Sequence, residues 1–268
     1  MKKNIAQFLE VCIVQTDLVW NDVSANLHHI EGLLGQQKEK PDLIVLPEMF
    51  NTAFVMNPSL TAEKPNGRTT QWLLHQAYTY QSVIAGSICV EENRCYYNRF
   101  IAAYPDGTLF TYDKRHLFRL ADEHKHFSSG QHSSVFEVKG WKIKPLICYD
   151  LRFPVWSKNR FLNDEYEYDC LLYVANWPQR RNRVWKTLLP ARAIENQAYV
   201  VGVNRIGMDG NSVPHAGESV VYDPKGNLMY AALPDTEMVE CKSLNFESLS
   251  SFRKEFPIAY DWDTFTID

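Results

Sequence analysis

The sequence predicts a layered α/β fold, a mixed four-layer sandwich with two β-sheets inside and helices outside. Strand-like and helix-like segments alternate along the 268 residues, and such alternation is typical of layered α/β proteins. Several neighbouring strand-like runs are joined by short turns, which argues against a wholly parallel sheet and against a TIM barrel. No internal repeat, low-complexity segment or Gly/Ser/Pro-rich linker divides the chain, so we expect one domain over residues 1–268.

The first half of the chain predicts two helices and five strands. Apolar side chains recur at helical spacing between residues 22 and 34, as at Val23, Leu27 and Ile30, and predict the first helix. The apolar run 42–46 is typical of a strand buried on both faces. The other elements expected here are a helix at 67–80, strands at 9–15, 82–88, 95–104 and 109–112, and a turn at 105–107.

The second half continues the alternation and ends in an aromatic segment. The expected elements are strands at 135–137, 141–147, 170–175, 199–204, 219–222, 228–232 and 237–242, and helices at 154–161 and 183–196. Residues 246–268 contain Phe252, Phe256 and Trp262. Such a segment packs against something, either the body of its own chain or a partner subunit.

Composition and charge exclude several classes of protein. The net charge is −4, so we expect no nucleic-acid partner, because phosphate-binding surfaces carry a basic excess. Three arginines at 180, 181 and 183 are interpreted as a solvated turn or a salt-bridge node. No run approaches the roughly 18 apolar residues of a membrane helix, and no secretory signal is visible. The six cysteines form no CxxC pair, so we expect a cytoplasmic protein with reduced thiols.

Cys148 is the candidate nucleophile. It follows an apolar strand, and a helix is expected to open at Pro154, so the thiol would be presented at the carboxyl end of a strand. Amide N–H groups at the start of that helix would favour the thiolate. Taken alone, a cysteine at a strand end is more often a small buried side chain.

Two further strand ends carry the remaining parts of one mechanism. Glu48 follows the buried strand at 42–46, where partial burial would suit a general base, although a surface glutamate is the commoner reading of one such residue. Lys114 follows the strand at 109–112 and would stabilise an oxyanion, although alone it reads as a solvated basic turn. Together with Cys148 they supply a base, a cation and a nucleophile, so we expect no metal and no cofactor. Four histidines at 116, 124, 126 and 132 leave a zinc site as a minor alternative.

At these residues the chain resembles the nitrilase, or carbon–nitrogen hydrolase, superfamily. The matching segments, in order, are 46–48, 113–118, 148–154, 176–178, 183–185, 191–197, 204–207 and 217–219. The resemblance implies an α-β-β-α sandwich that assembles as a homodimer or a higher homo-oligomer. It also implies a Glu–Lys–Cys triad, carried onto Glu48, Lys114 and Cys148. Glu123 looks like the second glutamate that family members often carry after the lysine, with Asp122 as its rival by position.

Within the superfamily, the 114–119 block followed by 121–124 and Phe127 is most similar to the ω-amidase branch. That branch implies hydrolysis of the terminal amide of an α-keto acid amide, 2-oxoglutaramate or 2-oxosuccinamate, through a thioester on the cysteine. The alternatives are another small-amide, N-carbamoyl or nitrile hydrolase with the same triad, a non-catalytic binding module, and a redox or zinc protein. The chain departs from the pattern at Pro145, which could shift the pairing of its strand, and at 213–215, which we expect to border the pocket.

The same reasoning assigns further residues to the substrate pocket. The backbone N–H of Tyr149 is expected to assist Lys114 at the oxyanion. A substrate carboxylate needs a cation, and Arg152 is the first candidate and Arg119 the second. For Arg152 a salt bridge to Asp150 is an equal alternative. The aromatic residues expected to line the pocket are Phe118 and Trp177, although such side chains are as often ordinary core.

Overall fold

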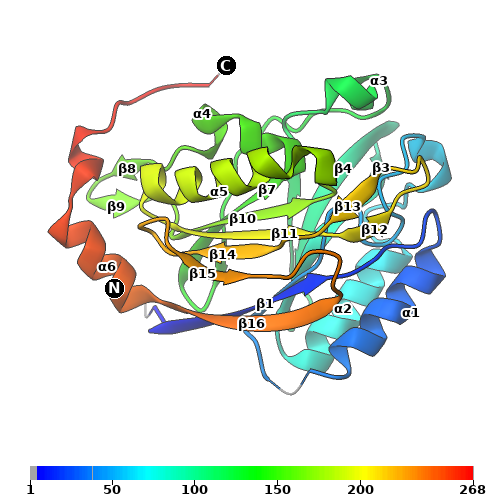
Figure 1. Cartoon of the computed structure of the whole chain (residues 1–268), viewed down its shortest axis with the longest axis horizontal. Coiled ribbons are helices and arrows are strands. Elements are labelled where there is room, and N and C mark those ends of the chain that lie inside the picture. Colours follow the sequence, from blue (N-terminus) through cyan, green and yellow to red (C-terminus); the bar gives the residue numbers. More distant parts are fainter. Residues whose placement is uncertain (1–4, 38, 268) are drawn as a thin grey trace.

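Two six-stranded β-sheets pack face to face, and helices cover both outer faces, as expected from the sequence (Figure 1). The computed structural model describes residues 5–37 and 39–267. In Figure 1, α1 and α2 cover the outer face of one sheet, while α4 and α5 lie on the opposite side of the molecule. The arrangement is the α-β-β-α sandwich that the alternation of elements predicts. No helix in the described ranges has the length and apolar character needed to cross a bilayer.

The first sheet has the strand order β16-β1-β2-β3-β4-β5, with β1, β2 and β3 mutually parallel. Its strands are β1 (Phe8–Gln15), β2 (Leu43–Val45), β3 (Val83–Glu92), β4 (Cys95–Ala103), β5 (Leu109–Asp113) and β16 (Met238–Asn245). The helices on it are α1 (Val23–Leu34) and α2 (Arg68–Tyr80). α1 begins where expected because the Asp22 carboxylate caps it, accepting a 2.9 Å hydrogen bond from the Ala25 N–H.

The second sheet has the order β15-β14-β11-β10-β7-β6, with β7, β10 and β11 parallel. Its strands are β6 (Phe136–Val138), β7 (Trp141–Ile147), β10 (Cys170–Ala175), β11 (Tyr199–Asn204), β14 (Val220–Tyr222) and β15 (Leu228–Ala231), and α5 (Asn182–Asn196) packs on it. Pro145 does not disturb this sheet. β6 pairs with β7 only as far as Ile143, so at Pro145 the strand has a neighbour on one side only, Leu172 of β10.

The core follows the alternation of side chains along each strand. In β1, Leu9, Val11 and Ile13 belong to the large cluster that includes the second sheet, whereas Cys12 and Val14 belong to the cluster under α1 and α2. Every one of these five side chains is at most 1% exposed. Close packing of buried apolar side chains therefore holds the sheets against each other and against their helices. The loops at the strand ends are held in place as a result.

The helix expected at 154–161 is wrong beyond Ser157. α4 (Pro154–Ser157) ends there, and the chain turns into a short hairpin of β8 (Phe161–Leu162) and β9 (Glu165–Tyr166). Asn159 is the physical cause, because its buried side chain donates to the Tyr168 carbonyl and its N–H donates to the Asn196 side chain. The short elements that the sequence did not reveal are η1 (Pro58–Leu60), η2 (Arg119–Ala121), α3 (Glu123–His126), η3 (Cys148–Arg152), η4 (Gln179–Arg181), β12 (Ile206–Met208), β13 (Pro214–Ala216), α6 (Phe246–Glu255) and η5 (Ile258–Asp261).

The C-terminal segment packs on the body of its own chain as far as residue 267 is described. In α6, the Arg253 guanidinium lies 2.8 Å from the Asp169 carboxylate and also donates to the Tyr168 carbonyl. Further along, the Trp262 ring lies 3.5 Å from the Lys158 ammonium. Of the two alternatives for this segment, contact with its own body is therefore observed.

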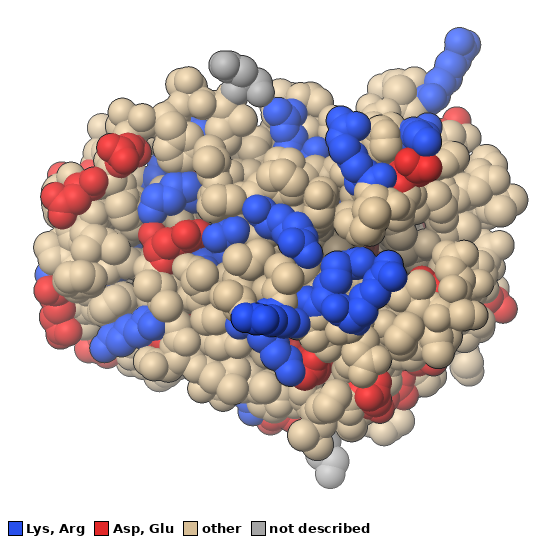
Figure 2. Space-filling model, turned by 45° about the horizontal axis from the view of Figure 1, so that its top comes forward, with Lys and Arg blue, Asp and Glu red and all other residues tan. Residues whose placement is uncertain are grey.

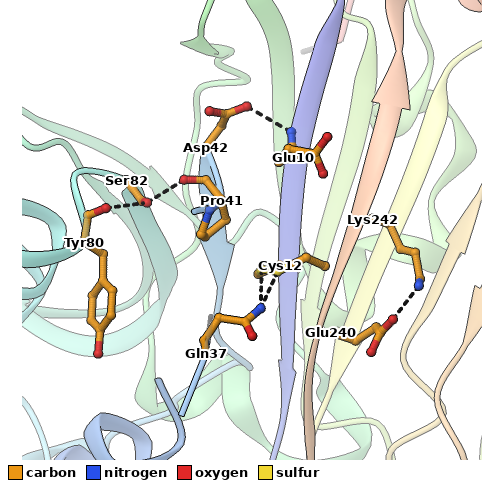
Figure 3. Close-up of a disulfide and its surroundings, with 10 residues drawn as sticks. Glu10, Cys12, Gln37, Pro41, Asp42, Tyr80, Ser82, Glu240 and Lys242 are labelled. Carbon is orange, nitrogen blue, oxygen red and sulfur yellow. Dashed lines mark hydrogen bonds and ion pairs between the residues drawn. A yellow bond between two sulfur atoms is a disulfide. The ribbon is translucent and has the colours of Figure 1, made fainter. Parts of the chain in front are cut away.

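One pair of cysteines departs from the expected reduced thiols. Cys12 of β1 stands directly opposite Cys241 of β16, and their sulfurs form a disulfide, beside which Gln37 lies (Figure 3). The two residues are 229 positions apart in sequence, so only the register of the sheet brings them together. The other four cysteines, among them Cys148, are free thiols.

Candidate active site

The three strand ends singled out in the sequence meet at one cavity of about 150 Å³. Glu48 follows β2, Lys114 follows β5 and Cys148 follows β7, so the first sheet supplies two of these residues and the second sheet supplies one. Because the carboxyl ends of parallel strands lie at the same edge of a sheet, residues far apart in sequence converge here. Other residues that line the cavity are Phe118, Tyr149, Arg152, Asn176, Trp177, Arg180, Arg181, Asp209 and His215.

Cys148 is held at a sharp turn between β7 and η3. Its φ of +42° lies in the left-handed region, which a non-glycine residue adopts only when its surroundings enforce it. Asp150, which is fully buried, supplies that enforcement. Its carboxylate accepts hydrogen bonds from the Ile147 N–H at 3.0 Å and from the Tyr112 hydroxyl at 2.7 Å. It also accepts the backbone N–H of His116 at 3.0 Å and lies 2.8 Å from Nδ1 of the same residue. The turn that carries the nucleophile is thereby joined to the segment that carries the lysine.

Lys114 lies between two carboxylates in a dry site. Its ammonium is 2.9 Å from Glu48 Oε1 and 3.1 Å from each oxygen of Glu123, and none of the three side chains is exposed by more than 1%. Burial alone would lower the pKa of Lys114, but the charges of Glu123 and Glu48 outweigh it and raise the pKa above its ordinary value. The lysine is therefore a fixed cation at neutral pH, placed beside the thiol.

Glu48 is fixed by four hydrogen bonds. Besides Lys114, its Oε1 accepts from the Asn98 side chain at 2.7 Å, its Oε2 accepts from the Asn176 N–H at 2.7 Å, and its carbonyl accepts from the Asn176 side chain at 2.5 Å. Asn98 lies in the middle of β4 and is completely buried. A buried asparagine within an apolar strand was the one sign of it in the sequence, and the sequence reasoning missed it.

The thiol of Cys148 is protonated in the resting site. Burial raises its pKa well above the ordinary value, the negative charge of Glu48 raises it further, and Lys114 opposes both. Burial and the neighbouring carboxylates therefore oppose whatever preference for the thiolate the N–H groups after the turn provide. A protonated thiol in contact with a carboxylate needs that carboxylate as its base, which is the role expected for Glu48.

Several predicted residues line the cavity and others do not. Tyr149, Arg152, Phe118 and Trp177 line it. Glu123 lies behind Lys114, whereas its rival Asp122 is exposed and pairs with Lys125. Arg119 is exposed in η2 and is not part of the lining.

Contacts also bear on the alternative roles considered for Arg152 and for the histidine-rich loop. Arg152 makes no salt bridge to Asp150, whose oxygens are occupied by Tyr112, His116 and Ile147; its guanidinium lies 5.4 Å from the Trp177 ring centre instead. Of the histidine-rich loop, His116 binds Asp150 through Nδ1 at 2.8 Å. In the described part of the chain these histidines join no cluster of three metal-binding side chains.

Two arginines of the lining were misinterpreted from the sequence, whereas the segment 213–215 borders the cavity as expected. Arg180 and Arg181, interpreted as a solvated turn or salt-bridge node, are part of the cavity wall. His215 lies within the segment expected to border the pocket, and its Nδ1 is 3.0 Å from the Val213 carbonyl. Burial, with the charge of Arg205, lowers the pKa of His215 to about 4, so this imidazole is neutral at neutral pH.

Comparisons with known proteins identify the relatives of this chain. A carbon–nitrogen hydrolase family model matches residues 10–254. The chain is 44% identical to omega-amidase YafV of Yersinia enterocolitica, over 97% of the chain and 98% of that protein. It is 31% identical to a 2-oxoglutaramate amidase of Bacillus subtilis, over 94% and 96% of the two chains. The crystal structure of XC1258 from Xanthomonas campestris, a CN-hydrolase superfamily protein with an arsenic adduct in its active site, is 38% identical and superposes with a TM-score of 0.95, covering 98% of this chain and all of that one.

Proposed function

Because the chain belongs to the carbon–nitrogen hydrolase family, we propose that it is an ω-amidase that hydrolyses the terminal carboxamide of 2-oxoglutaramate or 2-oxosuccinamate to the keto acid and ammonia. The observation that carries the proposal is the contact of a buried Glu48–Lys114 ion pair with the thiol of Cys148 in one cavity. The names of its relatives, an omega-amidase and a 2-oxoglutaramate amidase, support this choice of substrate.

Acylation begins with proton transfer from the Cys148 thiol to Glu48. The sulfur then attacks the amide carbon, and the negative charge that develops on the amide oxygen is stabilised by the Lys114 ammonium and the Tyr149 N–H. Each such donor is worth about 3–4 kcal/mol in the transition state. Glu48 returns the proton to the leaving nitrogen, the carbon–nitrogen bond breaks, and ammonia departs from a thioester on Cys148.

Deacylation uses the same groups in reverse order. Glu48 removes a proton from water as the water attacks the thioester carbon, and Lys114 again stabilises the oxyanion. The carbon–sulfur bond then breaks, the sulfur recovers its proton, and the acid leaves. Glu123 holds Lys114 in place through both half-reactions, and the hydrogen bonds from Asn98 and Asn176 keep Glu48 aimed at the sulfur.

The proposal extends to the assembly and location of the enzyme. We propose that residues 1–268 form one domain and that the protein is a homodimer or a higher homo-oligomer. A cytoplasmic location is proposed because four of the six cysteines, Cys148 among them, are free thiols, although the Cys12–Cys241 disulfide is not what that compartment favours.

The test is ammonia release from a panel of purified substrates. The panel contains 2-oxoglutaramate, 2-oxosuccinamate, glutamine, asparagine, a simple nitrile and an N-carbamoyl amino acid. Cys148→Ala should abolish the activity, whereas Cys170→Ala, which removes a buried thiol of β10 away from the cavity, should keep it. Release from the keto-acid amides alone supports the proposal. Ammonia release only from the nitrile or the N-carbamoyl amino acid would show that the proposed substrate is wrong. Activity in Cys148→Ala would overturn the mechanism.

A further inference from the structure

The cavity wall carries an excess of positive charge. Three arginines, Arg152, Arg180 and Arg181, line it in addition to Lys114. In Figure 2, Lys and Arg side chains gather in the middle of the face that is turned forward. Guanidinium groups stay protonated in proteins, so these are three permanent charges at the site of reaction.

None of the three arginines has an acidic partner among the residues that the structure describes. No ion pair joins Arg152, Arg180 or Arg181 to a carboxylate, although the chain contains 32 acidic residues. By contrast, the buried Arg205 and Arg253 each have one, in Asp17 and Asp169. Unpaired arginines in a half-buried wall are costly, so a negative group that enters the cavity would be bound strongly.

The electrostatics around Arg181 support the same point. Burial lowers the pKa of Arg181 and the charges of Arg180 and Arg152 lower it further, while a charge on Cys148 opposes them. Arg181 and Cys148 line the same cavity, so Arg181 would stabilise a negative charge that forms there during the reaction or enters with a substrate. A small substrate bound at Cys148 would therefore share one cavity with the Arg181 guanidinium.

Aromatic rings hold two of the guanidiniums in place before substrate arrives. The Arg181 guanidinium lies 4.9 Å from the Phe118 ring centre, and the Trp177 indole N–H donates to the Arg181 carbonyl at 3.0 Å. The Arg152 guanidinium lies 5.4 Å from the Trp177 ring centre. Cation–π contacts of this kind orient a guanidinium without using its N–H groups, which remain available to a ligand.

The acidic residues of the wall are already engaged. Glu48 pairs with Lys114, and Oδ1 of Asp209 accepts the N–H groups of Asn211 and Val213 within its own loop. His215 is neutral and adds no charge. The wall therefore presents more positive than negative charge to a group that enters, because three guanidinium groups outnumber the carboxylate of Asp209.

We propose that Arg152 and Arg181 bind the carboxylate and the 2-oxo oxygen of the substrate, and that this wall of donors makes the enzyme select 2-oxo acid amides over glutamine and asparagine. The inference rests on the proposed function and adds the basis of its specificity. A 2-oxo acid presents three acceptor oxygens in a row, which match the planar donors of guanidinium groups. The α-ammonium of an amino acid is a donor and a cation, so it is repelled at the same position.

The test compares binding and turnover in matched arginine variants. Arg181→Met and Arg152→Met remove a charge and keep an apolar stem against the ring. Arg183→Met is the control, because Arg183 is exposed in the same segment and is not part of the wall. Binding of 2-oxoglutarate and of glutamate is measured by calorimetry, and KM and kcat are measured with 2-oxoglutaramate, glutamine and the neutral amide butyramide.

For the wild-type protein we expect binding of 2-oxoglutarate and at least about 10-fold weaker binding of glutamate. In Arg181→Met and Arg152→Met we expect KM for 2-oxoglutaramate to rise by about 10-fold to 100-fold, with a much smaller effect on butyramide and a narrower preference over glutamine. The control variant should match the wild type.

Two results would overturn the inference: equal losses on 2-oxoglutaramate and butyramide, which indicate a merely structural role, or an unchanged preference over glutamine. Discrimination in binding by a protein that releases no ammonia from any keto-acid amide would support the arginine site and refute the proposed function instead.

Discussion

Replacing Glu123 by glutamine tests whether the second carboxylate keeps Lys114 effective as a cation. Glu123 lies 3.1 Å from the Lys114 ammonium in a site that is at most 1% exposed. With an effective dielectric constant of about 20, opposite charges at that separation attract by roughly 5 kcal/mol. Glu48 still contacts the ammonium in the variant, so part of this attraction is retained. We expect a loss of about 3 kcal/mol of transition-state stabilisation, which corresponds to a kcat that is lower by roughly a hundredfold.

The same variant changes the pH dependence of the reaction. The carboxylates raise the pKa of Lys114, so the stability that its charge provides is present at neutral pH and is lost only as the pH rises through the raised folded-state value. Without the charge of Glu123, burial is less opposed and the pKa of Lys114 falls. We therefore expect the alkaline limb of the kcat profile to move to lower pH in Glu123→Gln.

The assay is ammonia release from 2-oxoglutaramate at a series of pH values, with thermal unfolding as a check on folding. Asp122→Asn is the matched control, because that neighbouring carboxylate is exposed and pairs with Lys125 at 3.0 Å. The reasoning is refuted if a folded Glu123→Gln variant keeps the wild-type alkaline limb, or if Asp122→Asn shifts it equally.

Three further predictions concern the surroundings of the site and the sheet. Asp150→Asn should lower kcat more than it raises KM and should destabilise the fold by about 3 kcal/mol, because a buried acceptor of several hydrogen bonds loses its charge; an unchanged kcat in steady-state assays would contradict this. His215→Gln should reduce the loss of stability between about pH 6.5 and pH 4, because the lowered pKa of His215 means that the unfolded chain takes up the proton first; acid titrations of the wild type and the variant with the same slope would refute it. Reduction of the Cys12–Cys241 disulfide should lower the free energy of unfolding by about 5 kcal/mol, since the bond closes a loop of 229 residues. Cys12→Ser without reductant should match the reduced protein in denaturant titrations, and equal midpoints for the oxidised and reduced protein would count against a bond that forms in solution.

The three residues to which we assign the reaction could be picked out because each of them follows an apolar strand. Glu48, Lys114 and Cys148 need only the rule that parallel strands end at a common edge, and the structure brings them together there. The four-layer sandwich could be predicted for a similar reason, since buried runs and amphipathic helices are local patterns. The end of α4 could not, because Asn159 leaves the helical path to bind Asn196, a partner 37 residues away.

The arginines of the cavity wall and the disulfide depend on tertiary contacts, which leave no local pattern in the sequence. Arg181 and Arg183 look alike in the sequence, and only the direction of the chain after β10 puts the first in the cavity wall and leaves the second in solvent. Cys12 and Cys241 meet because β16 returns to the edge of the first sheet beside β1, a topological fact that spacing does not encode. In the sequence Asn98 is likewise only a polar residue within a strand, and its role depends on the hydrogen bond that it donates to Glu48 in the folded chain.

Because the active site is divided between the two sheets, catalysis depends on how the two sheets are positioned against each other. Glu48 and Lys114 belong to one sheet and Cys148 to the other, and Asp150 ties the two through Tyr112 and His116. A small slip between the layers would separate base from nucleophile while each sheet kept all of its own hydrogen bonds. Activity should then disappear at a lower denaturant concentration than the circular dichroism of the strands, and turnover would report on docking of the layers rather than on their formation.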